Sequence, residues 1–369
     1  MSARPPRKIL MTADTVGGVW TFAIELSAAL AGYGVELTLL SMGRLPDEAQ
    51  QAEADALPNL RLVPTAFRLE WMQNCQSDVV ESGQVLTQLA REVQPDVIHL
   101  NGYYHATLPF DVPLLLTAHS CVASWLRASK RQPIPLEWQH YMRWISGAVP
   151  AAGMITAPTR TFLTEFESLH GRGRAARAIW NGRSPLLFRT GPKRNVVLAA
   201  GRLWDEAKNI SILRQVVPHL DVPVLIAGED ISPDAKQIDV SGLGMLGRLS
   251  RTALASAMAE ARIFASPARY EPFGLAILEA ALSGCALALG DLPTLRELWD
   301  GAALFVPPDD VEGWQRTLAL LTKDRALTAA LGHRAHERAR QYTPERMAAE
   351  YVNAYSTLLS APSTMGVAA

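Results

Sequence analysis

The sequence predicts an α/β protein built from two domains, each with a parallel sheet. A buried strand over 8–13, a helix that ends at Gly34 and a strand over 35–41 form a βαβ unit, which joins parallel strands. A second series of this kind starts at Asn195, and 369 residues are enough for two domains of ordinary size. We expect a first domain over 1–184, to which a last helix within 344–369 returns, and a second domain over 185–343.

Apolar runs and helical periodicity place the remaining elements of the first domain. Strands are expected over 60–64, 95–101, 112–118, 153–157 and 177–181, and helices over 79–93 and from Thr159 to about 169. Proline, glycine and basic residues over 184–194 are typical of a linker between domains.

The second domain repeats the alternation of strands and helices. Strands are expected over 195–200, 222–227, 242–246, 262–266, 286–289 and 302–306. Helices are expected over 210–220, 250–259, 273–283 and 294–299, with two more between 311 and 342. Thr343 and Pro344 suit the N-cap and first position of a last helix that runs to about 359.

Composition argues against several classes of protein. Hydrophobic residues make up 49% of the chain, and a net charge of −1 without long basic blocks argues against a nucleic-acid partner. Cys75, Cys121 and Cys285 lack metal-site spacing and are expected to be reduced core residues of a cytoplasmic protein. Neither a signal-peptide core nor an apolar run of the roughly 20 residues that a membrane span needs is present.

Two features of the first domain point to a ligand. Gly17 and Gly18 lie at the first strand-to-helix turn, where backbone can approach a ligand closely, although a tight turn alone would explain them equally well. The dinucleotide pattern G-x-G-x-x-G is absent there, which argues against a nicotinamide cofactor. His119 follows a strand, at the sheet edge where α/β proteins bind ligands; the alternative is a packed or capping histidine.

The segment 125–144 is rich in Trp, Arg and Lys. It suits a basic, aromatic face for an anionic membrane surface or a lipid-linked acceptor. The favoured alternative is an ordinary helix whose aromatic rings pack inside.

Two carboxylates, Glu271 and Glu279, lie on a segment that is interpreted as a strand end, a loop and a helix. Eight helical residues rise about 12 Å, more than the roughly 5–10 Å between two carboxylates that flank one scissile bond. This spacing suits the two ends of one long ligand, and the helix N-terminus between them offers N–H groups to an anion. A nucleotide-sugar has this layout; the alternative is that both glutamates are exposed or structurally paired.

Arg202 and Lys208 follow the first strand of the second half. Arginine presents a planar fork and lysine a point charge, so the pair suits a diphosphate, although a solvated loop would also contain such residues.

Gly201-Arg202 followed by Lys208, and Glu271-Pro-Phe-Gly-x4-Glu279 followed by Ala280 and Gly284, resemble the donor half of retaining glycosyltransferases of the GT-B fold, in particular the large bacterial group 1 family. The resemblance spans most of the chain, and the two-glutamate motif is its specific part. Its supporting positions are Gly17-Gly18, His119, Asn181-Gly182, Gly228 and Pro307-Pro308-Asp309.

The resemblance implies two Rossmann-like domains that face each other across a cleft, and it implies roles for the motif residues. Arg202 and Lys208 would hold the donor pyrophosphate, and Glu279 would bind the ribose hydroxyls. Glu271 would contact the donor sugar, beside the backbone N–H groups of residues 273–275, that is Phe273, Gly274 and Leu275.

The remaining implied positions lie around this donor site. Gly17 and Gly18 would approach the phosphate or the acceptor from the first domain, and His119 would lie near the reacting sugar. Asn181 and Gly228 are carried over as substrate-binding positions.

The sequence departs from the family pattern at three places. Asn181-Gly-Arg183 replaces the common Asn-Gly-Val-Asp, Glu229 replaces a second glycine after Gly228, and the loop after Gly290 lacks paired glycines. The identity of the donor and the contacts to its sugar therefore stay open.

The expected function is transfer of a hexose from a UDP- or GDP-linked sugar to a hydroxyl of a glycan, a lipid-linked or a small-molecule acceptor, with retention. No Asp-x-Asp motif follows a strand, so no required metal is expected. No other cofactor is expected either, since the nucleoside diphosphate sugar is the donor substrate. The alternatives are a nucleotide-sugar epimerase, a phosphorylase, or a non-catalytic nucleotide-sugar-binding protein. An epimerase would consume donor without acceptor, a phosphorylase would need a pyridoxal lysine, and a binding protein would show no turnover. The expected location is cytoplasmic, with contact to the inner face of the membrane as an alternative.

Overall fold

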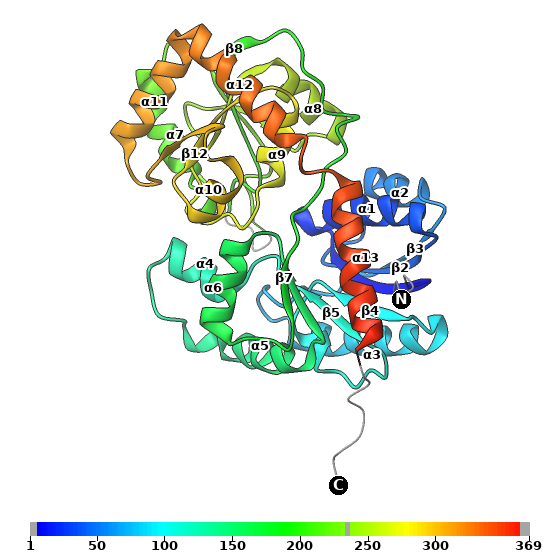
Figure 1. The fold of residues 1–369 in the computed structure, drawn as a ribbon. Helices are drawn as coiled ribbons and strands as arrows, with labels where there is room; N and C mark the ends of the chain where they lie inside the picture. The colour runs from blue at the N-terminus through cyan, green and yellow to red at the C-terminus, as the bar shows by residue number, and fades with distance from the viewer. Residues whose placement is uncertain (1–5, 233–236, 362–369) are drawn as a thin grey trace.

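The computed structural model describes residues 6–232 and 237–361, and it shows two parallel α/β sheets (Figure 1). In the described residues the first sheet has seven strands in the order β3-β2-β1-β4-β5-β6-β7. Its strands are β1 (Lys8–Asp14), β2 (Glu36–Met42), β3 (Leu60–Pro64), β4 (Val97–Leu100), β5 (Leu114–Thr117), β6 (Met154–Ala157) and β7 (Ala176–Ala178).

The helices of this domain cover both faces of its sheet. They are α1 (Gly18–Leu30), α2 (Glu48–Asp55), α3 (Gln76–Val93), α4 (Val122–Ser129), α5 (Gln139–Ala151) and α6 (Arg160–His170). Buried side chains of α1 and α2 line the core on one face, and those of α3 to α6 line the core on the other.

The second sheet has six strands in the described residues, in the order β10-β9-β8-β11-β12-β13. They are β8 (Arg194–Ala200), β9 (Val224–Ala227), β10 (Gly244–Gly247), β11 (Ala261–Ser266), β12 (Ala286–Gly290) and β13 (Ala303–Val306). Its helices are α7 (Ile210–Val216), α8 (Arg251–Glu260), α9 (Leu275–Leu282), α10 (Pro293–Trp299), α11 (Val311–Lys323) and α12 (Arg325–Ala339).

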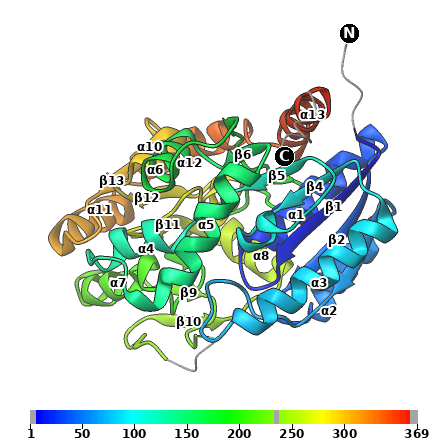
Figure 2. The same ribbon diagram turned by 90° about the horizontal axis from the view of Figure 1, so that it is seen from below.

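The last helix, α13 (Pro344–Ser360), returns to the first domain as expected, and it lies beside α1 in Figure 1 and near β4 and β5 in Figure 2. Thr343 caps it by accepting from the backbone N–H of Arg346, and Pro344 is its first residue. Tyr351 and Tyr355 are fully buried against the first sheet, where the Tyr355 hydroxyl lies 2.8 Å from Nδ1 of His99. The fold prediction is confirmed in both its parts, two Rossmann-like sheets and a returning helix.

Several predicted elements have different bounds in the structure, and one helix was missed. The strand expected over 177–181 is shorter, because the chain leaves the sheet at Trp180 to cross toward α13. The helix expected over 273–283 is Leu275–Leu282 in the structure, because Gly274 before it has a left-handed backbone and Gly284 after it has one too. Helix α2 was missed, since Ala54 is its one buried residue among those described. Its capping box, Asp47 with Gln50, was the available signal.

The segment 125–144 is not one helix. It spans the end of α4, a loop and the start of α5. Trp125, Trp138 and Trp144 pack against the first domain's core, as in the favoured interpretation. Trp125 also donates through Nε1 to Asp205 of the second domain at 2.9 Å, and Lys130 pairs with Glu206. Part of this segment therefore joins the two domains.

Candidate active site

The carboxyl ends of β1 and β8, the first strands of the two sheets, meet at the junction of the domains. A Cβ placed on Gly17 would lie 3.3 Å from Nη1 of Arg202 and 3.6 Å from Oδ1 of Asp14. One on Gly18 would lie 3.2 Å from Leu275, the first residue of α9. The N-termini of α1 and α9 therefore approach each other here, and helix N-termini favour anions.

Arg202 and Lys208 lie at this junction, as their position after β8 predicts. Arg202 donates through Nη2 to Asp205 at 3.0 Å, and its side chain is 39% exposed. Lys208 donates through Nζ to Glu271 at 2.5 Å. Although burial opposes ionisation, Arg202 and Lys208 hold the pKa of Asp205 below its ordinary value, so this carboxylate stays charged and orients Arg202.

The loop before α9 brings Glu271 to the same place. Gly274, with φ +86°, is in the left-handed region, and its ideal Cβ would lie 3.3 Å from the Glu271 side chain. Phe273 is buried in the second domain's core, so it can offer only backbone to a ligand. Leu275 begins α9 and leaves its N–H at the helix N-terminus.

Glu279 is buried on α9 and is already paired. Its Oε1 accepts from Nε of Arg183 at 2.6 Å, and Arg183 also bonds Glu25 on α1. All three side chains are at most 9% exposed. Burial disfavours the charged guanidinium of Arg183, but the Glu279 and Glu25 carboxylates outweigh this and raise its pKa. The structural pairing that the sequence left as an alternative is thus present for one oxygen of Glu279.

His119 follows β5, and it is held by Asn101, which follows β4. Asn101 uses its amide N–H on the carbonyl of Thr12, so its Oδ1 accepts from Nε2 of His119 at 2.8 Å. Burial lowers the pKa of His119 to about 3, and the ring of Phe22 packs on it edge-on. His119 is therefore a neutral imidazole with its lone pair on Nδ1.

Asn181 and Gly228 also lie near the junction. Asn181 is 6% exposed in the segment that crosses between the domains. Gly228 follows β9, where a Cβ would overlap the carbonyl oxygen of Gly201, so this glycine lets the strand end pack against the turn that carries Arg202.

Among residues 6–232 and 237–361, no group of three or more His, Cys, Asp or Glu side chains is placed to hold a metal ion. Cys75, Cys121 and Cys285 are buried and form no disulfide. No helix of the described chain is long and apolar enough to cross a bilayer.

Two family models match the chain, and between them they cover most of it. One, described as Glycosyltransferase Family 4, matches residues 16–185. The other, described as Glycosyl transferases group 1, matches residues 194–324, which include Arg202, Lys208 and both motif glutamates. The chain belongs to the group 1 glycosyltransferases. It is thus a glycosyltransferase of a retaining family that uses a nucleotide-sugar donor.

Curated relatives of this glycosyltransferase cover nearly its whole length. The phosphatidyl-myo-inositol mannosyltransferase of Mycolicibacterium smegmatis is 26% identical, over 94% of this chain and 92% of its own. A glycogen synthase of Mycobacterium tuberculosis is 25% identical, over 88% and 86%.

Solved structures share the fold. The sucrose-phosphate synthase of Thermosynechococcus elongatus has a TM-score of 0.79 at 18% identity, covering 96% of this chain and 99% of its own. Anabaena Alr3699/HepE in complex with UDP-glucose has a TM-score of 0.74 at 18% identity, covering 95% and 99%.

Sequence reasoning missed several residues at the junction of this glycosyltransferase. Asp14 ends β1 and accepts from the backbone N–H of Gly17 at 2.8 Å; its place at a strand end was the available signal. Tyr270, in the loop between β11 and α9, is partly buried against the first domain's core, where its hydroxyl lies 2.8 Å from Oγ of Ser124. Nothing local in the sequence marks Tyr270, because its partner is 146 residues away.

Proposed function

We propose that this glycosyltransferase moves a hexose from a UDP- or GDP-linked sugar to a hydroxyl group of an acceptor, with retention at the anomeric carbon. The observation that carries the proposal is the meeting of Arg202, Lys208 and Glu271 with the N-termini of α1 and α9. A departing nucleoside diphosphate needs stabilisation of negative charge, and fixed cations and helix N-termini supply it.

Each motif residue has a role in this reaction. Arg202 binds the pyrophosphate as a planar fork, and Lys208 exchanges its ion pair with Glu271 for a phosphate oxygen. Glu271 then accepts hydrogen bonds from hydroxyl groups of the donor sugar, next to the backbone N–H groups of residues 273–275. Glu279 accepts from the ribose through Oε2, because Arg183 occupies Oε1.

The first domain supplies the other side of the reacting sugar. His119 is neutral, so it acts as a hydrogen-bond acceptor through Nδ1 and not as an acid at neutral pH. Gly17 and Gly18 let the α1 N-terminus approach the phosphates or the acceptor, and Asn181 and Gly228 border the donor. We assign no covalent nucleophile; the leaving phosphate would assist attack from its own face.

The relatives bear on donor, acceptor and location. Two of the relatives are named for phosphatidyl-myo-inositol mannosyl transfer and for glycogen synthesis, and one of the solved structures is a complex with UDP-glucose. These support a nucleoside diphosphate hexose as donor and a glycan, a lipid-linked or a small polyhydroxylated acceptor. We place the enzyme in the cytoplasm, which fits its buried free thiols, and keep a peripheral membrane contact through 125–144 as a secondary proposal.

The test combines Arg202→Ala and Glu271→Ala with donor-dependent transfer assays. We expect each variant to fold and to lose about 100-fold or more in kcat, as when one charge-stabilising group is removed from an active site. Arg316→Ala is the matched control, since this arginine is 68% exposed on α11. Wild-type rates in both variants would refute the assignment. Release of nucleotide with donor alone, at the rate seen with acceptor, would favour an epimerase.

A further inference from the structure

Helix α4 of the first domain lies against the loop of the second domain that carries both donor cations. The helix packs on the short 3-10 turn Glu206–Lys208, which follows Arg202 and ends in Lys208. In Figure 1, α4 lies on the side of the first domain that faces the second. A helix of one domain therefore supports the proposed phosphate-binding loop of the other.

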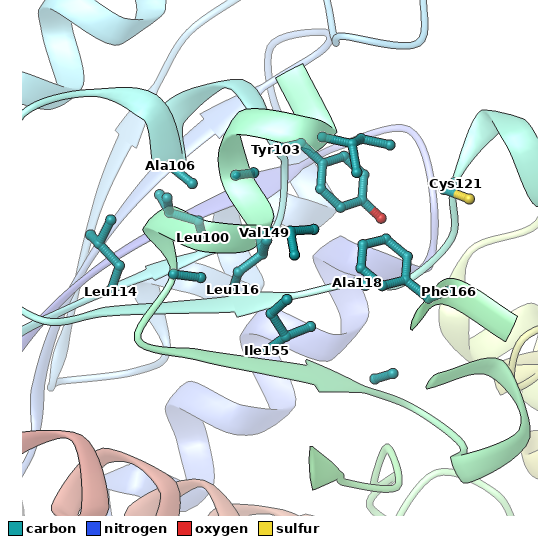
Figure 3. Packing of buried hydrophobic residues seen from close by; sticks show 14 of the residues in the cluster. Leu100, Tyr103, Ala106, Leu114, Leu116, Ala118, Cys121, Val149, Ile155 and Phe166 are labelled. Carbon is teal, nitrogen blue, oxygen red and sulfur yellow. The ribbon is translucent and has the colours of Figure 1, made fainter. Parts of the chain in front are cut away.

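The first turn of α4 is anchored in the packed core of its own domain. Cys121 caps the helix by accepting from the backbone N–H of Ser124 through Sγ, and Figure 3 shows its side chain at the same core as Tyr103 and Phe166. Leu126, one turn further along α4, belongs to this core too. The first domain therefore fixes the position of α4, and the loop that α4 touches does not.

Trp125 connects α4 to Asp205 and, through it, to Arg202. The indole N–H is a donor only, and it donates to Oδ1 of Asp205 at 2.9 Å. The backbone N–H of Ala207 donates to the same oxygen at 3.0 Å, and the other oxygen, Oδ2, accepts from Nη2 of Arg202 at 3.0 Å. A carboxylate is planar, so two donors on Oδ1 fix the direction in which Oδ2 holds the guanidinium.

Arg202 needs such a fixed direction. Its side chain is 39% exposed, and its Nη1 lies at the Gly17 turn. A long side chain that is free to change rotamer loses entropy when a ligand orders it, and this loss weakens binding. Asp205, which is 5% exposed, keeps the guanidinium in place before the donor arrives. The ring of Trp204, 5.5 Å from the guanidinium carbon, restrains it from another side.

The same helix also holds the loop that carries Glu271. The hydroxyl of Tyr270 accepts from the backbone N–H of Cys121 at 3.2 Å and lies 2.8 Å from Oγ of Ser124 on α4. Glu271 is the next residue along the chain, and it pairs with Lys208. Helix α4 therefore contacts both second-domain loops whose side chains meet at the proposed donor site.

We propose that Trp125 is a positioning residue for the donor pyrophosphate: its indole N–H holds Asp205, and Asp205 holds Arg202 in the direction that the phosphates require. The proposal rests on the proposed function, because it concerns how Arg202 meets the donor. It makes donor affinity depend on a side chain of the first domain, although Arg202 and Lys208 belong to the second.

The experiment measures the Kd of the full chain for UDP and GDP by thermal-shift titration, and the diphosphate that binds more tightly is used for all variants. Trp125→Phe keeps an aromatic ring in the core and removes the N–H. We expect its Kd to rise about fivefold or more, since a charged group loses a hydrogen bond that fixes it. Asp205→Asn interrupts the same contacts from the second domain, and its Kd should rise at least as much.

Trp144→Phe is the matched control. Trp144 is partly buried against the same core, where its ring meets that of Tyr104 in the first domain. The substitution removes the same atoms as Trp125→Phe and should leave the Kd within about twofold of wild type.

The double variant Trp125→Phe/Arg202→Ala separates positioning from a general packing defect. If Trp125 acts through Arg202, Trp125→Phe should change the Kd by less than about twofold once Arg202 is absent. An undiminished effect in that background would overturn the proposal, and so would a Kd for Trp125→Phe no higher than that of Trp144→Phe. Wild-type diphosphate affinity in Arg202→Ala, or no binding of either diphosphate to the wild type, would instead refute the proposed function and this role of Trp125 with it.

Discussion

Some charged side chains at the domain junction are almost completely buried. Arg183 is 2% exposed and lies between the carboxylates of Glu25 and Glu279. One comes from the first domain and the other from the second, so the guanidinium links the domains where the chain crosses between them. Such a triad stabilises only while it is complete, because a buried charge without its partner costs far more than an exposed one.

Arg183→Met tests this residue. We expect a loss of about 3–5 kcal/mol in the free energy of unfolding, since two buried carboxylates lose their shared cation. Urea unfolding followed by fluorescence measures it. Arg194→Met is the control, because Arg194 is 67% exposed in its pair with Glu260 and should shift stability by about 0.5 kcal/mol at most. Equal shifts in the two variants would show that the triad adds nothing to stability.

At the scale of elements, two contacts hold the domains together: one at the N-terminus of α6 and one where the two connecting segments cross. The N-terminus of α6 in the first domain is capped from the second, where Glu297 on α10 accepts from the backbone N–H of Thr161 at 2.8 Å. Beside it, the outgoing segment at Gly182 passes directly over the start of α13. Gly182 has an ordinary negative-φ or extended backbone, so space rather than conformation requires glycine there.

Gly182→Ala should therefore destabilise the crossing. The added Cβ would overlap the carbonyl of Thr343 and lie 2.6 Å from the nitrogen of Pro344, both of them backbone that cannot yield cheaply. We expect the melting temperature to fall by several degrees, corresponding to about 1–3 kcal/mol of overpacking. Gly32→Ala is the control, since a Cβ there meets nothing within 4 Å. An unchanged melting temperature in Gly182→Ala would mean that the segments do not cross this closely.

At the scale of the whole molecule, buried titratable groups set how stability responds to pH. Burial lowers the pKa of His105 and of His170 to about 4 and that of His119 to about 3, and it places the pKa of His99 well below 6.5. The unfolded chain binds more protons than the folded one between these values and 6.5, so this contribution to stability is lost as pH falls. Burial raises the pKa of Glu70 to about 7, which acts in the opposite sense between 4.5 and 7, and it also raises the pKa of Asp14 and of Glu165.

The four histidines outweigh the carboxyls with raised pKa values, so stability should fall from pH 6.5 toward pH 5. We expect a net uptake of about two protons on unfolding, or roughly 3 kcal/mol per pH unit. Urea midpoints at half-unit steps of pH give the slope. Glu70→Gln is an internal check on the sign: because it removes the opposing group with the largest printed shift, its slope should be steeper than that of the wild type. A flat or rising profile on acidification would contradict the burial of these histidines.

The sequence by itself determined the strands of both sheets, the α/β fold class and the motif positions. Buried parallel strands are near-continuous apolar runs, and residues such as Arg202 and His119 stand where such runs end. Only the tertiary structure decided which of these residues are partners. Glu279 accepts from Arg183, 96 residues away, and Glu70 accepts from the backbone N–H of Tyr103, 33 residues away. Hydrogen bonds and ion pairs act over a few ångströms, so they depend on how whole domains and loops dock, and no local pattern of residues encodes that docking.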